Sequence, residues 1–251
     1  MKSKVIINPK FSFIEEYIHN IPSISSDVLG DVIYNARNQI YANTVNGVNL
    51  VIKSFHVPSI LNRVIYSYFR DSKAKRSYDN AQELCRLAIG TAEPIAYIEI
   101  YKGGLIEHSY YISTKLEAND IRWWEKIENR ELLLKNLGAF ITKLHTKGVF
   151  HKDFSPGNIL YNIDEGGGYN FYLIDINRML FNVKDRGVLM QNFKCLHDDI
   201  EQTTVVASYY ADNIDSSKRT ELIEQALKAR AKYKKGQARK RKLKKLIGRG
   251  G

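Results

Sequence analysis

The residues best suited to chemistry lie in one segment, HKDFSPGN at 151–158, which has the spacing H-x-D-x-x-x-x-N. A further carboxylate, Asp175, follows the apolar pair Leu-Ile. Phosphoryl transfer from ATP needs such a set. One carboxylate positions the acceptor hydroxyl, while an amide oxygen and a second carboxylate hold Mg²⁺ on the phosphates. The spacing therefore indicates a phosphotransferase with ATP and Mg²⁺ as cofactors.

The residues after this segment predict a β-hairpin. β-prone runs at 159–163 and 169–174 flank the turn-forming sequence DEGGG. Because a hairpin places its open ends side by side, Asn158 and Asp175 are expected at the same end, with Asp153 in the loop just before. Mg²⁺ takes hard oxygen ligands and few protein groups, which suits one amide and one carboxylate. The alternative is that these polar residues only form turns, but the correctly spaced Asp175 makes chance a poor explanation.

A phosphotransferase of this type also needs a strand lysine for the α- and β-phosphates of ATP. Residues 48–55 form an apolar, β-prone run with Lys53 near its end, and an Asn-Gly hairpin signal precedes it. The sequence predicts partner strands at 39–45 and 31–34. A lysine among apolar strand residues is usually a snorkelling or edge residue, but the position of Lys53 matches the third strand of a nucleotide-binding lobe.

The strand lysine in turn needs a helix carboxylate as its partner. A helix is predicted from about 73 to 88, with Gly90 as its C-cap. Glu83 on this helix is the expected partner of Lys53, and Asp79 is its rival. A solvated carboxylate is the alternative for Glu83. The expected apolar stripe of the helix consists of Tyr78, Ala81, Cys85 and Ala88.

Two features of protein kinases are missing from the sequence. The turn at 35–38, Asn-Ala-Arg-Asn, has no G-x-G-x-x-G, so we expect Arg37 and backbone N–H groups to replace the glycine amides over the phosphates. The usual Asp-Phe-Gly is Asp-Ile-Asn at 175–177, with no A-P-E after it. The segment from 178 to about 191 is short for a loop that docks a peptide.

Taken in order, these residues resemble the lipopolysaccharide kinase family, the Kdo and heptose kinases of Gram-negative bacteria. The resemblance runs from about 28 to 210 and is strongest at VIKSF (51–55), KAKRSY (73–78), IGTAEP (89–94), 151–158 and IDINR (174–178). It implies a protein-kinase-like fold and phosphorylation of a core sugar on lipid A with ATP and Mg²⁺. By position, it implies that Asp153 is the catalytic base, that Asn158 and Asp175 are metal ligands, and that Lys53 binds phosphate.

Composition is that of a folded globular protein. A chain of 251 residues, 44% of them hydrophobic, is long enough for a two-lobed domain with a real core. Cys85 and Cys195 are far apart and match no metal or redox spacing, so we expect two inert thiols in a reducing cytosol. The apolar run at the N-terminus is too short for a secretory signal, and no stretch approaches the ~20 apolar residues of a membrane-spanning helix.

The positive charge is concentrated at the C-terminus. Residues 228–251 hold twelve Lys/Arg and no Asp/Glu, while the net charge of the chain is +11, so residues 1–227 are nearly neutral. Such a run is most often a solvated or disordered tail. The alternatives are a helix packed through Leu243, Leu246 and Ile247, or a site for a polyanion. Nucleic acid is not expected, because Tyr233 is the only aromatic residue available for stacking. An anionic membrane surface is favoured, which places the protein at the inner face of the inner membrane.

We therefore predict an α+β, protein-kinase-like, two-lobed fold. The expected parts are a β-rich N-lobe over 1–117, a helical C-lobe over 118–232 and a basic tail over 233–251. An amphipathic helix at 131–147, closed by Gly148, is expected to be the central helix of the C-lobe.

The predicted function is transfer of phosphate from ATP to a sugar hydroxyl, with Kdo of a lipid A precursor as the favoured acceptor. One alternative is a soluble small-molecule kinase of the aminoglycoside or choline phosphotransferase type. Another is a pseudokinase that binds a partner through its basic tail, which the absent glycine loop keeps open. The acceptor hydroxyl and the oligomeric state are left open.

Overall fold

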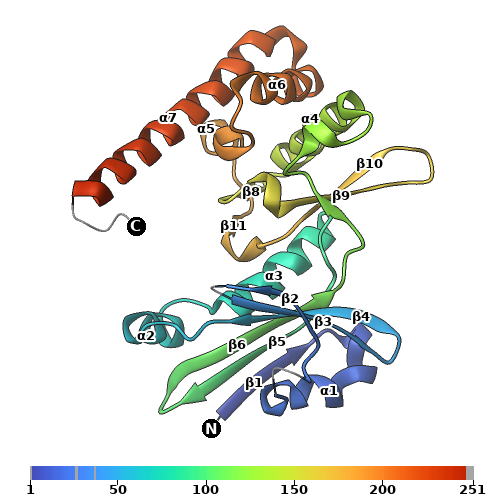
Figure 1. Ribbon diagram of the computed structural model, residues 1–251, viewed down its shortest axis with the longest axis vertical. Coiled ribbons are helices and arrows are strands. Elements are labelled where there is room, and N and C mark those ends of the chain that lie inside the picture. The colour runs from blue at the N-terminus through green and yellow to red at the C-terminus, as the bar shows by residue number, and fades with distance from the viewer. Residues whose placement is uncertain (1, 26–27, 37, 247–251) are drawn as a thin grey trace. The chain divides into compact units, whose positions relative to one another are not determined.

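The structure, a computed structural model, describes residues 2–25, 28–36 and 38–246 (Figure 1). It divides into two compact units. Unit 1 comprises Met1–Glu117 together with Asp175–Asn177, and unit 2 comprises Ala118–Ile174 and Arg178–Gly251. A short segment of the chain that follows unit 2 residues in sequence, Asp175–Asn177, is therefore part of unit 1.

Unit 1 is built on a six-stranded sheet with the order β1-β5-β6-β4-β3-β2, in which every neighbouring pair is antiparallel. The strands are β1 (Lys2–Ile7), β2 (Asp31–Asn35), β3 (Asn38–Val45), β4 (Val48–Phe55), β5 (Pro94–Lys102) and β6 (Leu105–Thr114). The predicted strands at 31–34, 39–45 and 48–55 are confirmed. Strands β1 and β5 were not predicted. They pair with each other although they lie near opposite ends of the sequence of unit 1.

Helices cover both faces of this sheet (Figure 1). One face carries a core of Leu50, Ile52 and their neighbours, which packs against η1 (Pro9–Ile14), α1 (Glu15–Asn20) and η2 (Ile21–Ser23). The other face carries α3 (Lys73–Arg86), where the Tyr78 and Tyr97 rings lie 5.4 Å apart. Because side chains alternate along a strand, Lys53 lies on the same face as α3.

Helix α3 begins as the sequence predicted and ends earlier. The Ser72 side chain caps it by accepting from the Lys75 N–H at 3.0 Å. The helix ends at Arg86, and Ala88 rather than Gly90 takes the left-handed conformation, with φ of 52°. A second helix of unit 1, α2 (Ile60–Tyr68), was not predicted.

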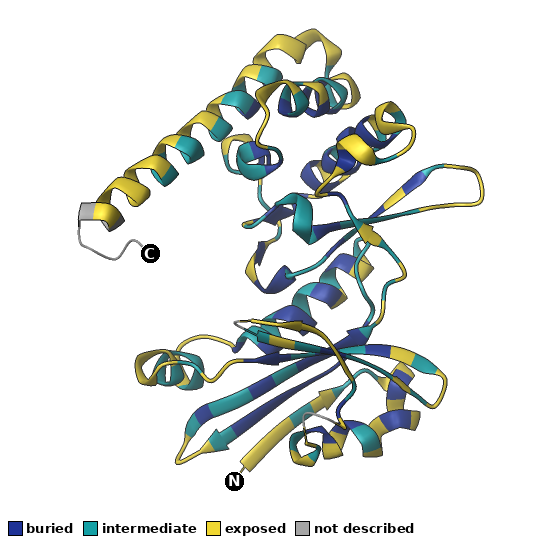
Figure 2. Ribbon diagram, in the orientation of Figure 1, coloured by how far each residue is buried: buried dark blue, intermediate teal, exposed yellow. Residues whose placement is uncertain are grey.

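Unit 2 is mainly helical, with one three-stranded sheet, β10-β9-β7, and one two-stranded sheet, β11-β8, among its described residues. Its helices are α4 (Arg130–Thr146), α5 (Arg186–Leu189), α6 (Ile200–Ile214) and α7 (Arg219–Leu246), with short 3-10 turns η3 (Trp124–Lys126), η4 (Pro156–Asn158), η6 (Met190–Cys195) and η7 (Ser216–Lys218). Its strands are β7 (Asn119–Asp120), β8 (Phe150–His151), β9 (Ile159–Ile163), β10 (Tyr169–Leu173) and β11 (Met179–Leu180). The turn η5 (Ile176–Arg178) bridges the unit boundary in sequence. Figure 2 shows buried residues on α4 and α6, which pack against each other.

The central helix and the hairpin agree with the predictions. In α4 the predicted stripe of Leu134, Leu137, Ile141 and Leu144 is buried. Gly148, with φ of 66°, closes the helix and turns the chain into β8. Strands β9 and β10 pair from Tyr169↔Ile163 to Leu173↔Ile159, so the hairpin holds the start of one strand beside the end of the other.

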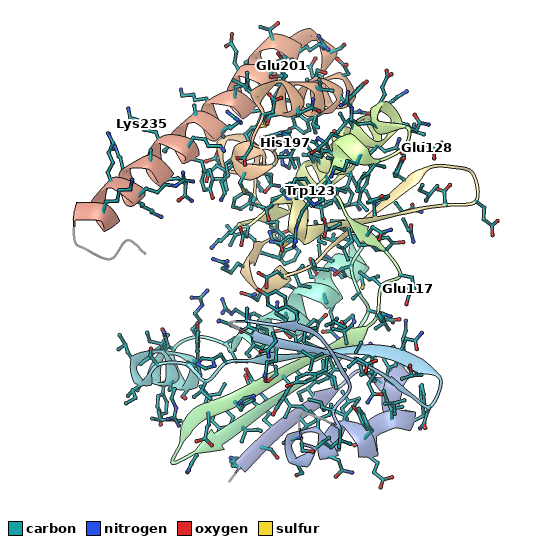
Figure 3. The ribbon with its side chains drawn as sticks, viewed as in Figure 1. Glu117, Trp123, Glu128, His197, Glu201 and Lys235 are labelled. Carbon is teal, nitrogen blue, oxygen red and sulfur yellow. The ribbon has the colours of Figure 1, made fainter. Side chains whose placement is uncertain are left out.

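The C-terminal tail is helical as far as the structure describes it. The first turns of α7 bury Leu222 and Ala226, whereas Leu243 is 58% exposed. The exposed end of the helix agrees with a solvated tail, whereas Leu243 is not packed as the alternative required. The Leu246 side chain and Ile247 lie outside the described residues. Lys235 projects from this helix away from the rest of unit 2 (Figure 3). Among the described helices, none is long and apolar enough to cross a membrane.

Candidate active site

In unit 2, His151 fixes the loop that carries Asp153. Its Nδ1 accepts a hydrogen bond from the Asp153 backbone N–H at 3.0 Å. This bond leaves Nε2 as the protonated nitrogen, and Nε2 donates to the carbonyl oxygen of Ile174 at 3.1 Å. One buried ring thus ties the loop to the end of the hairpin, and its two bonds select a single tautomer.

Asn158 makes a second connection between the loop and the hairpin. Its Nδ2 donates to the Asp153 carbonyl oxygen at 2.8 Å, and its own carbonyl oxygen accepts from the Ile174 N–H at 3.1 Å. Because the amide nitrogen is bound to the loop, the amide oxygen is the atom left to act as a ligand. Ile174, the residue before Asp175, is therefore held at both its N–H and its C=O.

The Asp153 carboxylate has one partner in unit 2. Arg178 donates from a guanidinium nitrogen to Asp153 Oδ2 at 3.1 Å, and both side chains are about half exposed. An exposed pair of this kind contributes only ~0–1 kcal/mol to stability. Among the described residues, no donor binds Asp153 Oδ1. The carboxylate therefore presents one oxygen that can accept a proton.

In unit 1, Lys53 binds Asp175. Lys53 Nζ lies 2.7 Å from Asp175 Oδ1, and Asn177 Nδ2 donates to the same oxygen at 2.9 Å. The Lys53 ammonium is 16% exposed, so this pair is far less solvated than the Arg178 pair. Asp175 has a left-handed backbone with φ of 53°, which is uncommon for a residue other than glycine. The backbone conformation and the two donors together fix the direction of this carboxylate.

The predicted pair of Lys53 with Glu83 is not formed in this structure. Arg86 binds both Glu83 oxygens, at 2.6 and 2.7 Å, and this hydrogen bonding lowers the pKa of the Glu83 carboxyl. The rival Asp79 pairs instead with Lys75 at 2.7 Å.

The reason is the position of Glu83 on α3. Its buried residues are Ala74, Ser77, Tyr78, Ala81 and Leu84, whereas Cys85 of the predicted stripe is exposed. Each helix position turns by about 100°, so Glu83 lies on the outer side, away from the buried stripe.

Asn80 is the helix residue that reaches the Asp175 segment. Its Nδ2 donates to the Ile176 carbonyl oxygen at 2.6 Å within unit 1. Sequence reasoning missed Asn80 because it looked for a carboxylate. The correct stripe, with Leu84 in place of Cys85, would have pointed to it. Asn177 and Arg178 were likewise missed as partners of the two aspartates, although both follow Asp175 directly.

A family model decides the relationship to known proteins. The model of the lipopolysaccharide kinase (Kdo/WaaP) family matches residues 30–225, which is well over half of the chain. The chain belongs to the lipopolysaccharide kinase family. It is therefore an enzyme of the phosphotransferase class that uses an alcohol as acceptor.

A solved structure with a TM-score above 0.5 shows the same fold. The structure of WaaP in complex with acyl carrier protein has a TM-score of 0.58 at 12% identity, and the match covers 90% of this chain and 99% of that one. The Rio2 kinase of Chaetomium thermophilum, in its complex with ADP, Mg²⁺ and phosphoaspartate, gives a TM-score of 0.47 at 15% identity over 92% of this chain and 78% of that one. Among curated proteins, none matches the sequence. The fold is protein-kinase-like, with a β-rich part and a helical part.

The phosphate cover and the metal site are two further features expected of a lipopolysaccharide kinase. Arg37, predicted to lie over the phosphates, falls outside the described residues. The part of the chain that the structure describes holds no group of three or more His, Cys, Asp or Glu side chains arranged for a metal. This is compatible with Mg²⁺, which needs few protein ligands when phosphates supply others.

Cys85 and Cys195 are free thiols, and burial raises the pKa of Cys195 to about 11.

Proposed function

We propose that this lipopolysaccharide kinase transfers the γ-phosphate of ATP to a sugar hydroxyl, and that the acceptor is Kdo on a lipid A precursor. The observation that carries the proposal is the double fixation of Ile174 by His151 and Asn158. It anchors the chain between Asn158 and Asp175, the two residues that the motif assigns to the metal. Phosphoryl transfer depends mainly on positioning and electrostatic stabilisation, which such a rigid loop supplies.

Asp153 is the proposed general base. The acceptor hydroxyl would bind at its Oδ1, the oxygen for which the described residues offer no donor. Arg178 at Oδ2 keeps the carboxylate in one orientation, and the backbone bond to His151 keeps its Cα in place. The hydroxyl proton would move to Asp153 as the oxygen attacks the γ-phosphorus, while the bond from that phosphorus to the bridging oxygen breaks and ADP leaves.

Unit 1 is the proposed nucleotide-binding lobe, corresponding to the predicted N-lobe over 1–117. Lys53 is proposed to bind the α- and β-phosphates, exchanging its bond to Asp175 for phosphate oxygens. Asn158, through its amide oxygen, and Asp175 would hold Mg²⁺. The ion, when bound, neutralises charge that develops on the phosphates. Arg37 stays a prediction for the phosphate cover.

A screen of acceptors tests this function. Labelled ATP with Mg²⁺ is offered with Kdo-bearing lipid A precursor, with free sugars, with aminoglycosides and choline, and with a generic protein substrate. We expect label to transfer to the Kdo-bearing lipid and to be lost when Kdo is removed from it. Transfer to an aminoglycoside or choline alone would favour the small-molecule kinase instead. No transfer to any acceptor, with retained ATP binding, would favour a pseudokinase.

The distal part of α7 is proposed to bring the enzyme to an anionic membrane surface, at the inner face of the inner membrane. Near its base the helix is anchored, because Arg230 donates to the His197 carbonyl oxygen at 3.4 Å and Lys234 pairs with Asp198, lowering the pKa of that carboxyl. Beyond Lys235 its described cations are exposed, among them Arg239, Lys240, Arg241 and Lys242. Such cations lie around the whole helix, which favours electrostatic attachment over insertion of one apolar face.

A truncation after Lys235 tests this role and keeps the pair of Lys234 with Asp198. Binding to anionic vesicles should fall and the melting temperature should stay unchanged. A matched full-length variant with Arg239, Lys240, Arg241 and Lys242 replaced by Gln should lose binding in the same way. If the truncated protein melts earlier and still binds vesicles as before, the tail is structural.

A further inference from the structure

Helix α2 of unit 1 is amphipathic, but its polar face packs against the protein. None of its nine residues is buried. In Figure 2 the helix shows no dark blue segment, in contrast to α3 in the same unit. A surface helix normally turns its apolar stripe to the core. The orientation of α2 therefore calls for a physical explanation.

The polar face closes an open strand edge. Strand β4 pairs with β6 only as far as Phe55↔Ser109, so β6 is without a strand partner on that side at Ile106. The Ile106 N–H donates to Ser67 Oγ at 2.8 Å, and Arg63 Nε donates to the Ile106 carbonyl oxygen at 2.8 Å. Unpaired strand edges must be satisfied or covered. Ser67 and Arg63 do so, and this fixes which side of α2 faces inward.

The outward side of α2, which begins at Ile60 next to Ser67, is an exposed apolar face. Ile60 is 75% exposed, Leu61 72%, Tyr68 66%, and Phe69 just beyond the helix end 81%. The spacing of Ile60, Leu61 and Tyr68 places them on one side of the helix, together with the half-buried Val64. Single exposed hydrophobic residues, scattered over a surface, are ordinary. Several of them side by side, as here, mark an interaction site.

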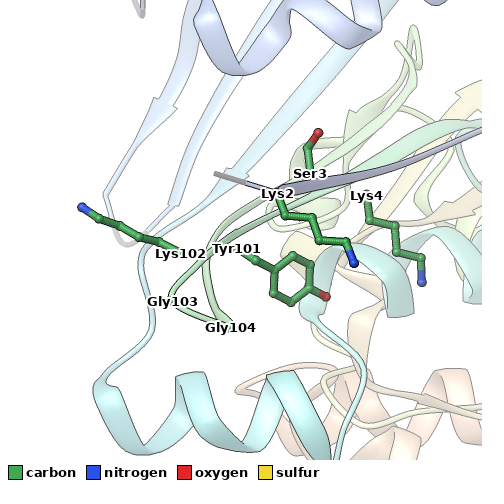
Figure 4. Close-up of a pocket in the computed structure, with 7 residues that line it drawn as sticks. All are labelled: Lys2, Ser3, Lys4, Tyr101, Lys102, Gly103 and Gly104. Atoms are coloured by element: carbon green, nitrogen blue, oxygen red, sulfur yellow. The ribbon is translucent and has the colours of Figure 1, made fainter.

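Cations lie near the C-terminal end of this apolar face. Arg70 follows Phe69 and is exposed. The Tyr68 hydroxyl donates to the Gly104 carbonyl oxygen at 3.5 Å, which places the β5–β6 turn next to the end of α2. Figure 4 shows the hollow at this turn, of about 690 Å³, whose lining includes Lys2, Lys4 and Lys102. An apolar face with cations beside it is complementary to an anionic lipid surface.

We propose that the apolar face of α2, consisting of Ile60, Leu61, Tyr68 and Phe69, inserts into the headgroup region of an anionic bilayer. Tyr68 and Phe69 are aromatic residues of the kind that gather at membrane interfaces. The inference deepens the proposed function, on which it rests for its lipid-linked acceptor, by naming a surface of unit 1 that meets the membrane. Unlike the distal part of α7, this surface binds through apolar contact and should resist screening by salt.

Vesicle binding tests the proposal without ATP or acceptor, so its failure is separate from failure of the kinase chemistry. The background is the full-length chain with Arg239, Lys240, Arg241 and Lys242 replaced by Gln, at high salt, with vesicles of phosphatidylcholine and phosphatidylglycerol. The variant Leu61→Ser/Phe69→Ser should bind about tenfold more weakly. The matched control Val32→Ser/Ile33→Ser, on exposed positions of β2 in the same unit, should bind like its parent. Both variants should keep the parent melting temperature, because none of the four residues is buried.

Three outcomes would overturn the proposal. The first is equal vesicle binding by the α2 variant and its parent, which would mean that α2 does not touch lipid. The second is measured without lipid, by sedimentation equilibrium: a parent that self-associates, and an α2 variant that does not, would show that a second copy of the chain covers this face. The third is an equal loss of binding in the β2 control, which would contradict a site confined to α2.

Discussion

Asp153 and Asp175 are the two carboxylates of the proposed chemistry, and the structure holds them differently. Asp175 is bound at one oxygen by Lys53 and Asn177 and has a left-handed backbone. Asp153 meets a single guanidinium, that of Arg178, in a solvent-exposed pair. A group that holds a metal ion benefits from a fixed direction, whereas a base needs an oxygen free for a proton. The different surroundings support different roles for two residues of the same type.

The largest expected effect comes from removing the fixed carboxylate. Asp175→Ala should lower turnover by ~10³-fold or more, because a lost metal ligand costs several kcal/mol of transition-state stabilisation. ATP binding in this variant should also lose its dependence on Mg²⁺, which titration calorimetry with and without the ion would measure. An unchanged Mg²⁺ dependence would place the ion elsewhere and remove the contrast between the two aspartates.

Removing the partner of the fixed carboxylate should have the next largest effect. Lys53→Met takes a charge from the phosphates and from Asp175, and should lower kcat/KM by about 10²–10³-fold. The comparison variant is Glu83→Gln, which changes a carboxylate that binds Arg86 instead, and should stay within a few-fold of wild type. Similar losses in both variants would show that Lys53 turns to Glu83 during turnover.

Removing the partner of the exposed carboxylate should have a smaller effect. Arg178→Gln leaves Asp153 held by its backbone bonds and removes only a solvent-exposed ion pair, so turnover should fall by no more than about tenfold. Binding of ATP should not change. Steady-state kinetics would separate the two parameters, and a loss as large as that of Lys53→Met would mean that Arg178 binds substrate directly.

The smallest expected effect is on the pH dependence of the stability of unit 2, through the buried side chain of His145. Burial lowers the pKa of His145 to about 3, and the ring bonds to the Tyr210 hydroxyl at 3.0 Å. An unfolded histidine titrates near ~6.5. Between these values the unfolded chain binds a proton that the folded chain does not, so stability falls as pH decreases through this window. His145→Gln should weaken the drop in melting temperature between neutral and mildly acidic pH, and an unchanged drop would assign it to other groups.

Local patterns in the sequence predicted much of this fold and site. The apolar stripe of α4, the turn between β9 and β10, and the spacing from Asp153 to Asn158 are each encoded within a few residues. The structure bears out the helix and the hairpin because a periodic stripe and a turn depend little on distant parts of the chain. The assignment of catalytic and metal-binding roles remains a prediction from the motif.

Other features depend on contacts between distant segments, which local patterns do not reveal. Strand β1 exists because it pairs with β5, for example Lys2 with Tyr101. The partner of Lys53 could not be read from local patterns, because it is Asp175, which lies 122 residues further along the chain. The apolar side of α2 would have been taken for a core face, since only the open edge of β6 at Ile106 reveals its orientation.

The most direct test of the central claim is the comparison of ATP binding and phosphate transfer in Asp153→Asn. Asparagine keeps the size of the side chain and a hydrogen-bonding oxygen, but it cannot act as a base at neutral pH. We predict that the variant binds ATP and Mg²⁺ as tightly as wild type and transfers phosphate to the Kdo-bearing lipid about 10²–10⁴-fold more slowly. Transfer near the wild-type rate would contradict the account, because Asp153 would then not be the base.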